Sequence, residues 1–296
     1  MKGVLRMKEN KKVINILIAM SVLFLSLIVY ITYFELFVKE DIIINSYNQR
    51  QRETEENTVR GRIFDKNGVV LADSTKTETF NLLMDGKLAN LTVTDPPYNV
   101  NYEGTAGKIK NDNMADEKFY QFLLDAFTLT EKAMAKDASI YVFHADTEGL
   151  NFRRAFDAAG FYLSGTCIWK KQSLVLGRSP YQWQHEPILF GWKKSGKHAW
   201  YSDRKQSTIW EFDRPKKNAD HPTMKPVPLV AYPILNSSMT GCIVLDPFGG
   251  SGSTLIACEQ TKRICYTIEL DEKYCDVIAK RYIEQVCGSD NVFLIR

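Results

Sequence analysis

The stretch LTVTDPPY, residues 91–98, decides how the rest of the chain is interpreted. Residues 91–94 predict a buried strand, which Pro96 and Pro97 end because proline cannot extend a hydrogen-bonded ladder. A carboxylate, a rigid carbonyl and an aromatic ring are thereby gathered at the carboxyl end of a strand, where open α/β sheets bind ligands. Asp95 and the Pro96 carbonyl can each accept a hydrogen from an exocyclic amino group, while Tyr98 stacks on its ring. A plain strand-ending turn is the alternative, and these residues alone do not decide between the two.

A second stretch, GCIVLDPFGGSGST at residues 241–254, predicts a strand, a glycine-rich turn and then a helix over 255–260. Glycines allow the backbone to approach a ligand closely. No lysine follows the last glycine, so the turn is not a phosphate-binding P-loop. The next predicted strand, 264–268, ends at Glu269, which is placed to accept a hydrogen bond from a ribose hydroxyl. The stretch therefore predicts a site for an adenosine derivative with an uncharged tail.

Together the two stretches resemble the amino-methylating DNA methyltransferases that use S-adenosylmethionine. The DPPY box precedes the FxGxG box at 248–252, an order that resembles the permuted, or β, class of that family. Between them, HPTMKP at 221–226 is similar to the HPTxKP element of the class. The resemblance runs from about Asp73 to the C-terminus. It implies an α/β fold with a doubly wound, mostly parallel sheet, Rossmann-like and circularly permuted, and the alternation of predicted strands and helices after Tyr98 agrees with this.

The resemblance also implies roles for individual residues. The target amino group would be held by Asp95, Pro96, Pro97 and Tyr98. The cofactor would be bound by Asp246, Phe248, Gly249, Gly250, Gly252 and Glu269, by Asp73 near its adenine, and by Thr223 and Lys225 near its methionyl carboxylate. The base would be flipped out and methylated by direct displacement, without a covalent enzyme intermediate. No metal is expected, because the six cysteines show no metal-binding spacing.

Residues 193–218 are rich in basic and aromatic side chains, which suits contact with phosphates and stacking on bases. The alternative is a solvated hairpin with a few core aromatics. By resemblance, a target-recognition region lies just before the HPTxKP element, so we expect DNA with a short recognition sequence as the partner; a paired restriction endonuclease is left open. The expected DNA-binding residues are Arg178, Lys193, Lys194, Lys197, Arg204, Lys205, Arg214, Lys216 and Lys217.

The N-terminal part differs in kind from the rest. A basic tail, residues 1–12, precedes an uncharged run at 13–34, which at about 33 Å is long enough for a membrane helix. Residues 35–72 predict a polar stalk and a hairpin, and with the preceding segments they resemble the start of class B penicillin-binding proteins. We therefore expect a hybrid: an anchor joined to a methyltransferase domain at 73–296. The charge balance would place everything after 34 outside the cell, in conflict with chemistry that requires the cytoplasm.

Two alternatives stay open. Cytosine N4 can be methylated with the same geometry, and the aspartate that opens the DPPY box favours adenine N6. A protein of another class, a non-catalytic membrane-anchored protein that takes part in cell-wall or division interactions, would use residues 1–72 as its working part.

Overall fold

The computed structural model describes residues 20–28, 30, 32, 72–101, 103–104, 107–108, 111–176, 180–214 and 224–285. The chain divides into two compact units, Met1–Thr58 and Val59–Arg296. In the first unit, the described residues are helical and exposed.

The membrane helix predicted at 13–34 is not supported. Among the described residues, no helix is long and apolar enough to cross a bilayer. The predicted single-pass membrane location, with the compartment conflict drawn from it, is therefore wrong. The other residues of 13–34, and the hairpin predicted at 59–72 apart from its last residue, lie outside the described part of the chain.

The second unit is built on a seven-stranded sheet in the order β7-β5-β6-β4-β1-β8-β9. Strand β1 is parallel to β4 and to β8, and β8 is parallel to β9, whereas β6 is antiparallel to both β4 and β5. Strand β7 pairs with β5 in parallel. The predicted mostly parallel sheet is thus confirmed. The strands are β1 (Ala89–Thr94), β4 (Met134–Phe143), β5 (Phe161–Val175), β6 (Trp183–Lys193), β7 (Ile209–Glu211), β8 (Ile243–Asp246) and β9 (Ile264–Thr267).

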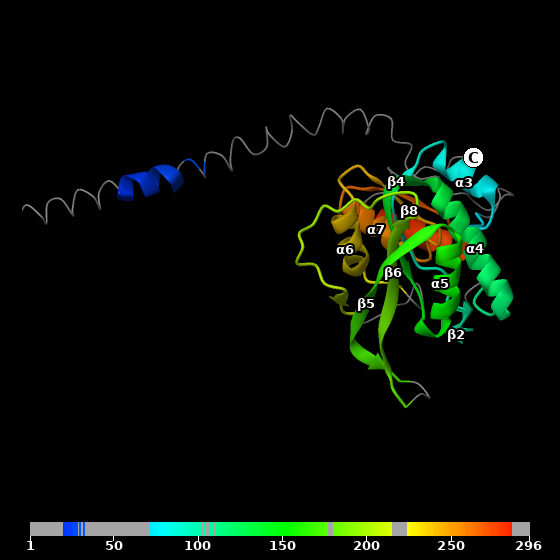
Figure 1. Cartoon of the computed structure of the whole chain (residues 1–296). Helices are drawn as coiled ribbons and strands as arrows, with labels where there is room; N and C mark the ends of the chain where they lie inside the picture. Colours follow the sequence, from blue (N-terminus) through cyan, green and yellow to red (C-terminus); the bar gives the residue numbers. More distant parts are fainter. Residues whose placement is uncertain are drawn as a thin grey trace, which may run out of the picture. The chain divides into compact units, whose positions relative to one another are not determined.

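Helices cover both faces of this sheet (Figure 1). Helices α3 (Thr77–Met84), α4 (Asp116–Ala133) and α5 (Gly149–Ala158) pack on one face. Helices α6 (Val227–Ser237) and α7 (Ser253–Gln260) pack on the other. The remaining elements are a two-stranded hairpin, β2 (Glu103–Gly104) with β3 (Gly107–Lys108), the 3₁₀ turn η2 (Asp146–Glu148) and helix α8 (Glu272–Gln285).

The alternation of side chains along β4 shows why both faces are apolar. Ile140 and Val142 pack toward α4 and α5, whereas Tyr141 and Phe143 pack in the core that includes α6 and α7. Successive side chains of a strand point to opposite faces, so a strand covered by helices on both sides needs an apolar residue at every position. This accounts for the nearly continuous apolar run that ends β4.

The position of the site follows from the strand order. Chain connections lead from β1 outward to β4 on one side and from β8 outward to β9 on the other, so the order reverses between β1 and β8. Ligands of open α/β sheets bind at the carboxyl ends of the strands at such a switch point. Pairing of Leu91 with Val244 and of Thr92 with Leu245 sets the two strand ends side by side. The DPPY and FxGxG boxes, far apart in the sequence, therefore begin at the same edge.

Strands β5 and β6 extend beyond the sheet as a two-stranded hairpin, which projects from the body of the second unit in Figure 1. Its pairing runs from Lys170 with His185 to Val175 with Trp183. Leu176 and Tyr181, beside its turn, are almost fully exposed.

Candidate active site

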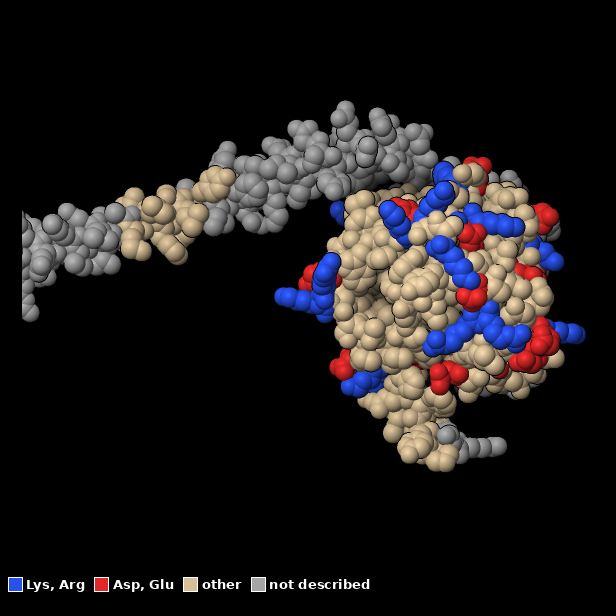
Figure 2. All heavy atoms as spheres, in the orientation of Figure 1, with Lys and Arg blue, Asp and Glu red and all other residues tan. Residues whose placement is uncertain are grey.

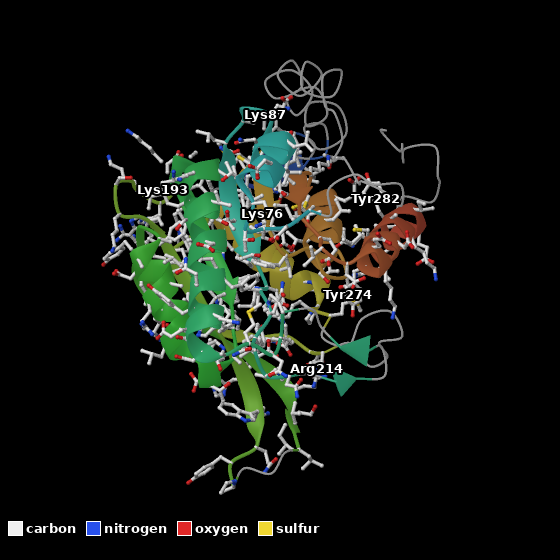
Figure 3. The ribbon with its side chains drawn as sticks, turned by 90° about the vertical axis from the view of Figure 1, so that its right-hand side faces the viewer. Lys76, Lys87, Lys193, Arg214, Tyr274 and Tyr282 are labelled. Atoms are coloured by element: carbon white, nitrogen blue, oxygen red, sulfur yellow. The ribbon has the colours of Figure 1, made fainter. Side chains whose placement is uncertain are left out.

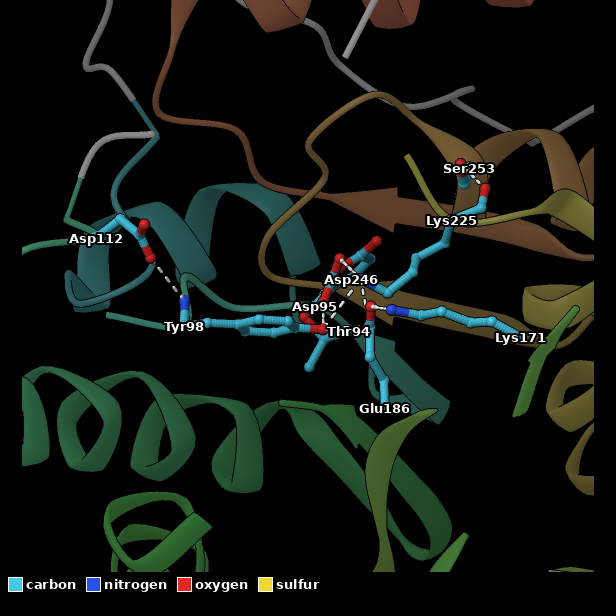
Figure 4. Close-up of polar contacts among 9 residues, drawn as sticks. All are labelled: Thr94, Asp95, Tyr98, Asp112, Lys171, Glu186, Lys225, Asp246 and Ser253. Atoms are coloured by element: carbon cyan, nitrogen blue, oxygen red, sulfur yellow. Dashed lines mark hydrogen bonds and ion pairs between the residues drawn. The ribbon is translucent and has the colours of Figure 1, made fainter. Parts of the chain in front are cut away.

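Asp95 comes directly after β1 and is the acceptor in a compact hydrogen-bonded group (Figure 4). Its Oδ1 accepts a 2.6 Å hydrogen bond from the Tyr98 hydroxyl, and its Oδ2 lies 2.6 Å from Lys225 Nζ. Burial raises the pKa of the carboxyl group, while the Lys225 ammonium acts in the opposite direction. The side chain nevertheless keeps 27% of its surface exposed, so an incoming amino group can reach it.

Tyr98 is fixed at both ends. Its backbone N–H donates to Asp112 Oδ1 at 3.0 Å, and its hydroxyl also lies 3.2 Å from Glu186 Oε2. Burial, and then the negative charges of Asp95 and Glu186, raise the pKa of Tyr98 well above its usual value. The hydroxyl therefore keeps its proton and acts as a hydrogen-bond donor.

Two residues of this group were missed by the sequence analysis: Glu186 on β6 and Lys171 on β5. Lys171 Nζ lies 2.6 Å from Glu186 Oε1, and Lys225 Nζ lies 3.3 Å from Glu186 Oε2. Burial by itself would raise the pKa of Glu186, but the two ammonium groups outweigh it and lower the pKa to about 2. In the sequence, Lys171 and Glu186 are a lysine and a glutamate on either side of the hairpin turn. Their proximity can be inferred only once the register of the two strands, which pairs Trp169 with Glu186, is known.

Lys171, Glu186, Lys225 and Asp95 thus form a chain of alternating charges. Lys171 and Lys225 are both buried, with 6% of their surface exposed. A buried ion needs a partner because its desolvation is costly. Two ammonium groups and two carboxylates satisfy this requirement without leaving a net charge inside the protein.

The glycine-rich turn lies one strand away, between β8 and α7. Gly250 and Gly252 have positive φ angles of 52° and 78°, a region that disfavours other residues. A Cβ added to Gly249 would lie 2.5 Å from Thr267 Oγ1. The turn is therefore packed tightly against β9, and glycine is needed for contacts within the protein as well as for access to a ligand.

Glu269 follows β9 and lies against this turn. Its Oε2 accepts a hydrogen bond from the Gly250 N–H at 2.7 Å, and its Oε1 accepts one from the Asp271 N–H at 2.8 Å. Burial raises the pKa of its carboxyl group, and the two N–H donors oppose this shift. A carboxylate fixed at the end of a strand beside a glycine-rich turn is suited to accept hydrogen bonds from ribose hydroxyls, so the residues present fit an adenosine-type cofactor.

Asp246, at the end of β8, is turned into the protein. It accepts hydrogen bonds from Thr94 Oγ1 at 2.9 Å and from the Phe248 N–H at 3.1 Å. Burial raises its pKa to about 7. The residue predicted for cofactor binding therefore orders the start of the glycine-rich turn through internal hydrogen bonds.

The other residues expected near the cofactor, Asp73, Lys225 and Thr223, differ in how the structure places them. Asp73 accepts hydrogen bonds from the backbone and hydroxyl of Thr75, and the next residue, Ser74, donates to the Pro247 carbonyl at 2.6 Å. This brings Asp73 to the border of the glycine-rich turn. The Lys225 carbonyl accepts from Ser253 Oγ at 2.8 Å, while its Nζ points to Asp95. Thr223 lies outside the described residues.

Those of the expected DNA-binding residues that the structure describes do not form one group. Lys193 pairs with Glu131 at 3.4 Å and Lys194 with Asp157 at 2.8 Å, both near the end of β6 that is remote from Glu186. Arg214 lies toward the opposite end from Lys193 (Figure 3). Its backbone N–H donates a hydrogen bond at 2.7 Å to Oε1 of Gln172, a residue of the β5–β6 hairpin. Lys197 also lies at this remote end of β6. Arg204 and Lys205 lie in the loop before β7.

Charge is mixed rather than gathered on the face shown in Figure 2, where lysines and arginines alternate with acidic residues. Of the aromatics in 193–218, Trp210 is buried in the core, whereas Trp200 and Tyr201 remain exposed. Arg178, Lys216 and Lys217 lie outside the described residues.

The fold agrees with what comparisons of the chain show. The family model of N6/N4 DNA methyltransferases, described as "DNA methylase", matches residues 89–281. The chain therefore belongs to this family of S-adenosylmethionine-dependent DNA methyltransferases, which act on adenine N6 or cytosine N4.

Two relatives and two solved structures illustrate what the chain is similar to. The type II methyltransferase M.HpaI of Haemophilus parainfluenzae is 26% identical over 226 residues, covering 69% of this chain and 71% of the relative. The DNA adenine methyltransferase YhdJ of Escherichia coli is 26% identical over 227 residues, covering 65% and 75%. The M1.HpyAVI–SAM complex superposes with a TM-score of 0.56 at 22% identity, covering 71% and 97%. The cytosine-N4-specific PvuII DNA methyltransferase gives 0.58 at 16% identity, covering 80% and 92%.

Proposed function

We propose that this chain methylates adenine N6 in DNA and that Asp95 is the residue that receives the target amino group. The observation that carries the proposal is the position of Asp95: partly open, held by Tyr98, and one strand from the glycine-rich turn. Cytosine N4 is the second candidate, because its amino group would meet the same acceptors. The aspartate that opens the DPPY box favours adenine.

The chain's own residues would activate the target nitrogen by position. Its lone pair is delocalised into the ring, so it is a weak nucleophile. Asp95 and the Pro96 carbonyl accept one amino hydrogen each, which favours a pyramidal nitrogen, and Tyr98 stacks on the ring. Such placement of acceptors supplies most of the catalysis in a direct displacement.

The displacement balances without a further reactant. S-adenosylmethionine supplies the methyl group: the target nitrogen forms the bond to the methyl carbon, and the pair of the broken carbon–sulfur bond stays on sulfur. The methylated nitrogen then carries one proton too many. Asp95 already accepts a hydrogen bond from that amino group, so its carboxylate receives the proton and later releases it to water. The base must be flipped out of a duplex to reach this position.

We further propose that the cofactor is held by the glycine-rich turn with Glu269, and that the chain is of the permuted class. The order of the boxes supports the class: β1, with its DPPY box, comes before β8 in the chain yet lies beside it in the sheet. Residues 73–296 would form the methyltransferase domain. Residues 1–72, with their resemblance to the start of class B penicillin-binding proteins, would be a separate segment without a part in methyl transfer.

The test uses purified chain, plasmid DNA grown without adenine methylation, and cofactor carrying a tritiated methyl group. We expect tritium in the DNA with the wild type. Asp95→Ala should incorporate at least about a hundredfold less, because the amino group loses its charged acceptor. Calorimetry should show that its cofactor affinity stays within about threefold, as Asp95 is not assigned to the cofactor. Equal incorporation by the variant would remove Asp95 from the chemistry.

A further inference from the structure

The Lys225 ammonium occupies the place that the proposed function gives to the target amino group. Its Nζ is 2.6 Å from Asp95 Oδ2, 3.0 Å from the Tyr98 hydroxyl, and lies over the Tyr98 ring at 5.0 Å from the centroid. The target needs the same two features, a carboxylate acceptor and an aromatic face. An amino group that enters must therefore compete with Lys225.

A second carboxylate lies within reach of the same ammonium. Glu186 Oε2 is 3.3 Å from Lys225 Nζ, and the other oxygen of Glu186 is held by Lys171 at 2.6 Å. The Lys225 carbonyl accepts a hydrogen bond from the Ser253 hydroxyl at 2.8 Å, so its backbone is anchored while its ammonium lies within ion-pair distance of both Asp95 and Glu186. A small rotation moves the ammonium from Asp95 to Glu186 without leaving it unpaired.

We infer that Glu186 is a positioning residue for methyl transfer, which takes over the Lys225 ammonium when the target amino group reaches Asp95. The inference rests on the proposed function. After the transfer of Lys225, Asp95 is free to accept the amino hydrogen. The ammonium is also moved away from the target nitrogen, which gains positive charge as the methyl group arrives, and like charges at short range repel.

Lys171 completes the arrangement. Glu186 lies between Lys171 and Lys225, so the four charges alternate before Lys225 moves. No buried ion loses its last partner when the Lys225 ammonium moves from Asp95 to Glu186. Through these two residues, the β5–β6 hairpin contributes to the site of methyl transfer.

The test compares Glu186→Gln, Lys225→Met and the double variant in the full-length chain, with tritium transfer to plasmid DNA as the readout. Glutamine keeps the shape of Glu186 but not its charge, so among the described residues Asp95 is left as the only carboxylate that forms an ion pair with Lys225. We expect turnover to fall at least tenfold while calorimetry gives an unchanged cofactor affinity. In the double variant no ammonium competes for Asp95, so turnover should rise above that of Glu186→Gln and match Lys225→Met.

Glu131→Gln is the matched control, because it removes a carboxylate that pairs with a lysine at the other end of β6; it should leave turnover unchanged. Wild-type turnover in Glu186→Gln, or a double variant no faster than Glu186→Gln, would overturn the inference and leave the proposed function standing. A folded wild type that binds the cofactor yet transfers no methyl group would overturn the proposed function and the inference together.

Discussion

Thr94 Oγ1 donates a 2.9 Å hydrogen bond to Asp246 Oδ1, so the ends of β1 and β8 are joined side chain to side chain although 152 positions separate the two residues. This bond lies where the strand order reverses, directly before the DPPY box and within the glycine-rich stretch. It fixes the relative position of the two halves of the site.

Asp246 should make stability depend on pH. Burial raises its folded pKa from 3.8 to about 7, so the folded state binds its proton more tightly than the unfolded state does. The stabilising contribution is complete below about pH 4 and is lost as the pH rises to about 7. At about 1.36 kcal/mol per pKa unit, the loss is at most about 4 kcal/mol.

Urea unfolding of the wild type and Asp246→Asn from pH 4 to 7.5 isolates this contribution, because the neutral amide cannot titrate. We expect the wild-type free energy of unfolding, minus that of the variant, to decrease over this range. A difference that does not change with pH would show that Asp246 keeps an ordinary pKa.

Gly249→Ala should destabilise the second unit, because the added Cβ would lie 2.5 Å from Thr267 Oγ1 and 3.3 Å from the Ile268 carbonyl. Overpacking of this kind costs about 1–3 kcal/mol. Gly165→Ala is the matched control, since nothing lies within 4 Å of its added Cβ. Urea midpoints should separate the two variants clearly, and equal midpoints would contradict the tight packing of the turn on β9.

Glu269→Ala should weaken binding of S-adenosylmethionine at least about tenfold, the loss expected for a charge-assisted hydrogen bond together with the order that Glu269 gives the turn. Glu269→Gln should lie between the wild type and the alanine variant because an amide retains one acceptor. Glu259→Ala, on the exposed side of α7, is the control. Calorimetry measures all three, and unchanged affinity in the alanine variant would remove Glu269 from the cofactor site.

Arg214→Gln should weaken DNA binding and flatten its salt dependence, because each lost phosphate contact releases about one counterion fewer. Lys194→Gln removes the same charge from the remote end of β6, where Lys194 pairs with Asp157, and should leave the slope unchanged. Binding to labelled duplex DNA at several salt concentrations distinguishes them. A slope altered by the Lys194 variant alone would place the DNA at the other end of the sheet.

The strands that carry the two boxes could be predicted because their limits are local. Strands predicted at 91–94, 241–245 and 264–268 appear as β1, β8 and β9. Each is a short apolar run ended by proline, glycine or an acidic residue, and such signals need no knowledge of the rest of the chain.

The hairpin and its part in the site could not be predicted in the same way. Strand β5 continues past Trp169 to Val175, and this polar continuation is stabilised by pairing with β6, a tertiary effect. Glu186 and Lys171 acquire partners only when the hairpin is placed against Lys225. For the same reason, the basic composition of 193–218 did not show that its first lysines lie far from Asp95.

The most direct test is to identify the modified nucleoside. DNA methylated in vitro by the purified chain is digested to nucleosides and analysed by mass spectrometry, with Asp95→Ala in parallel. The proposed function predicts N6-methyladenine with the wild type and none above background with the variant. N4-methylcytosine in its place would contradict the adenine assignment, and the absence of any amino-methylated nucleoside from a folded, cofactor-binding wild type would contradict the role of Asp95 altogether.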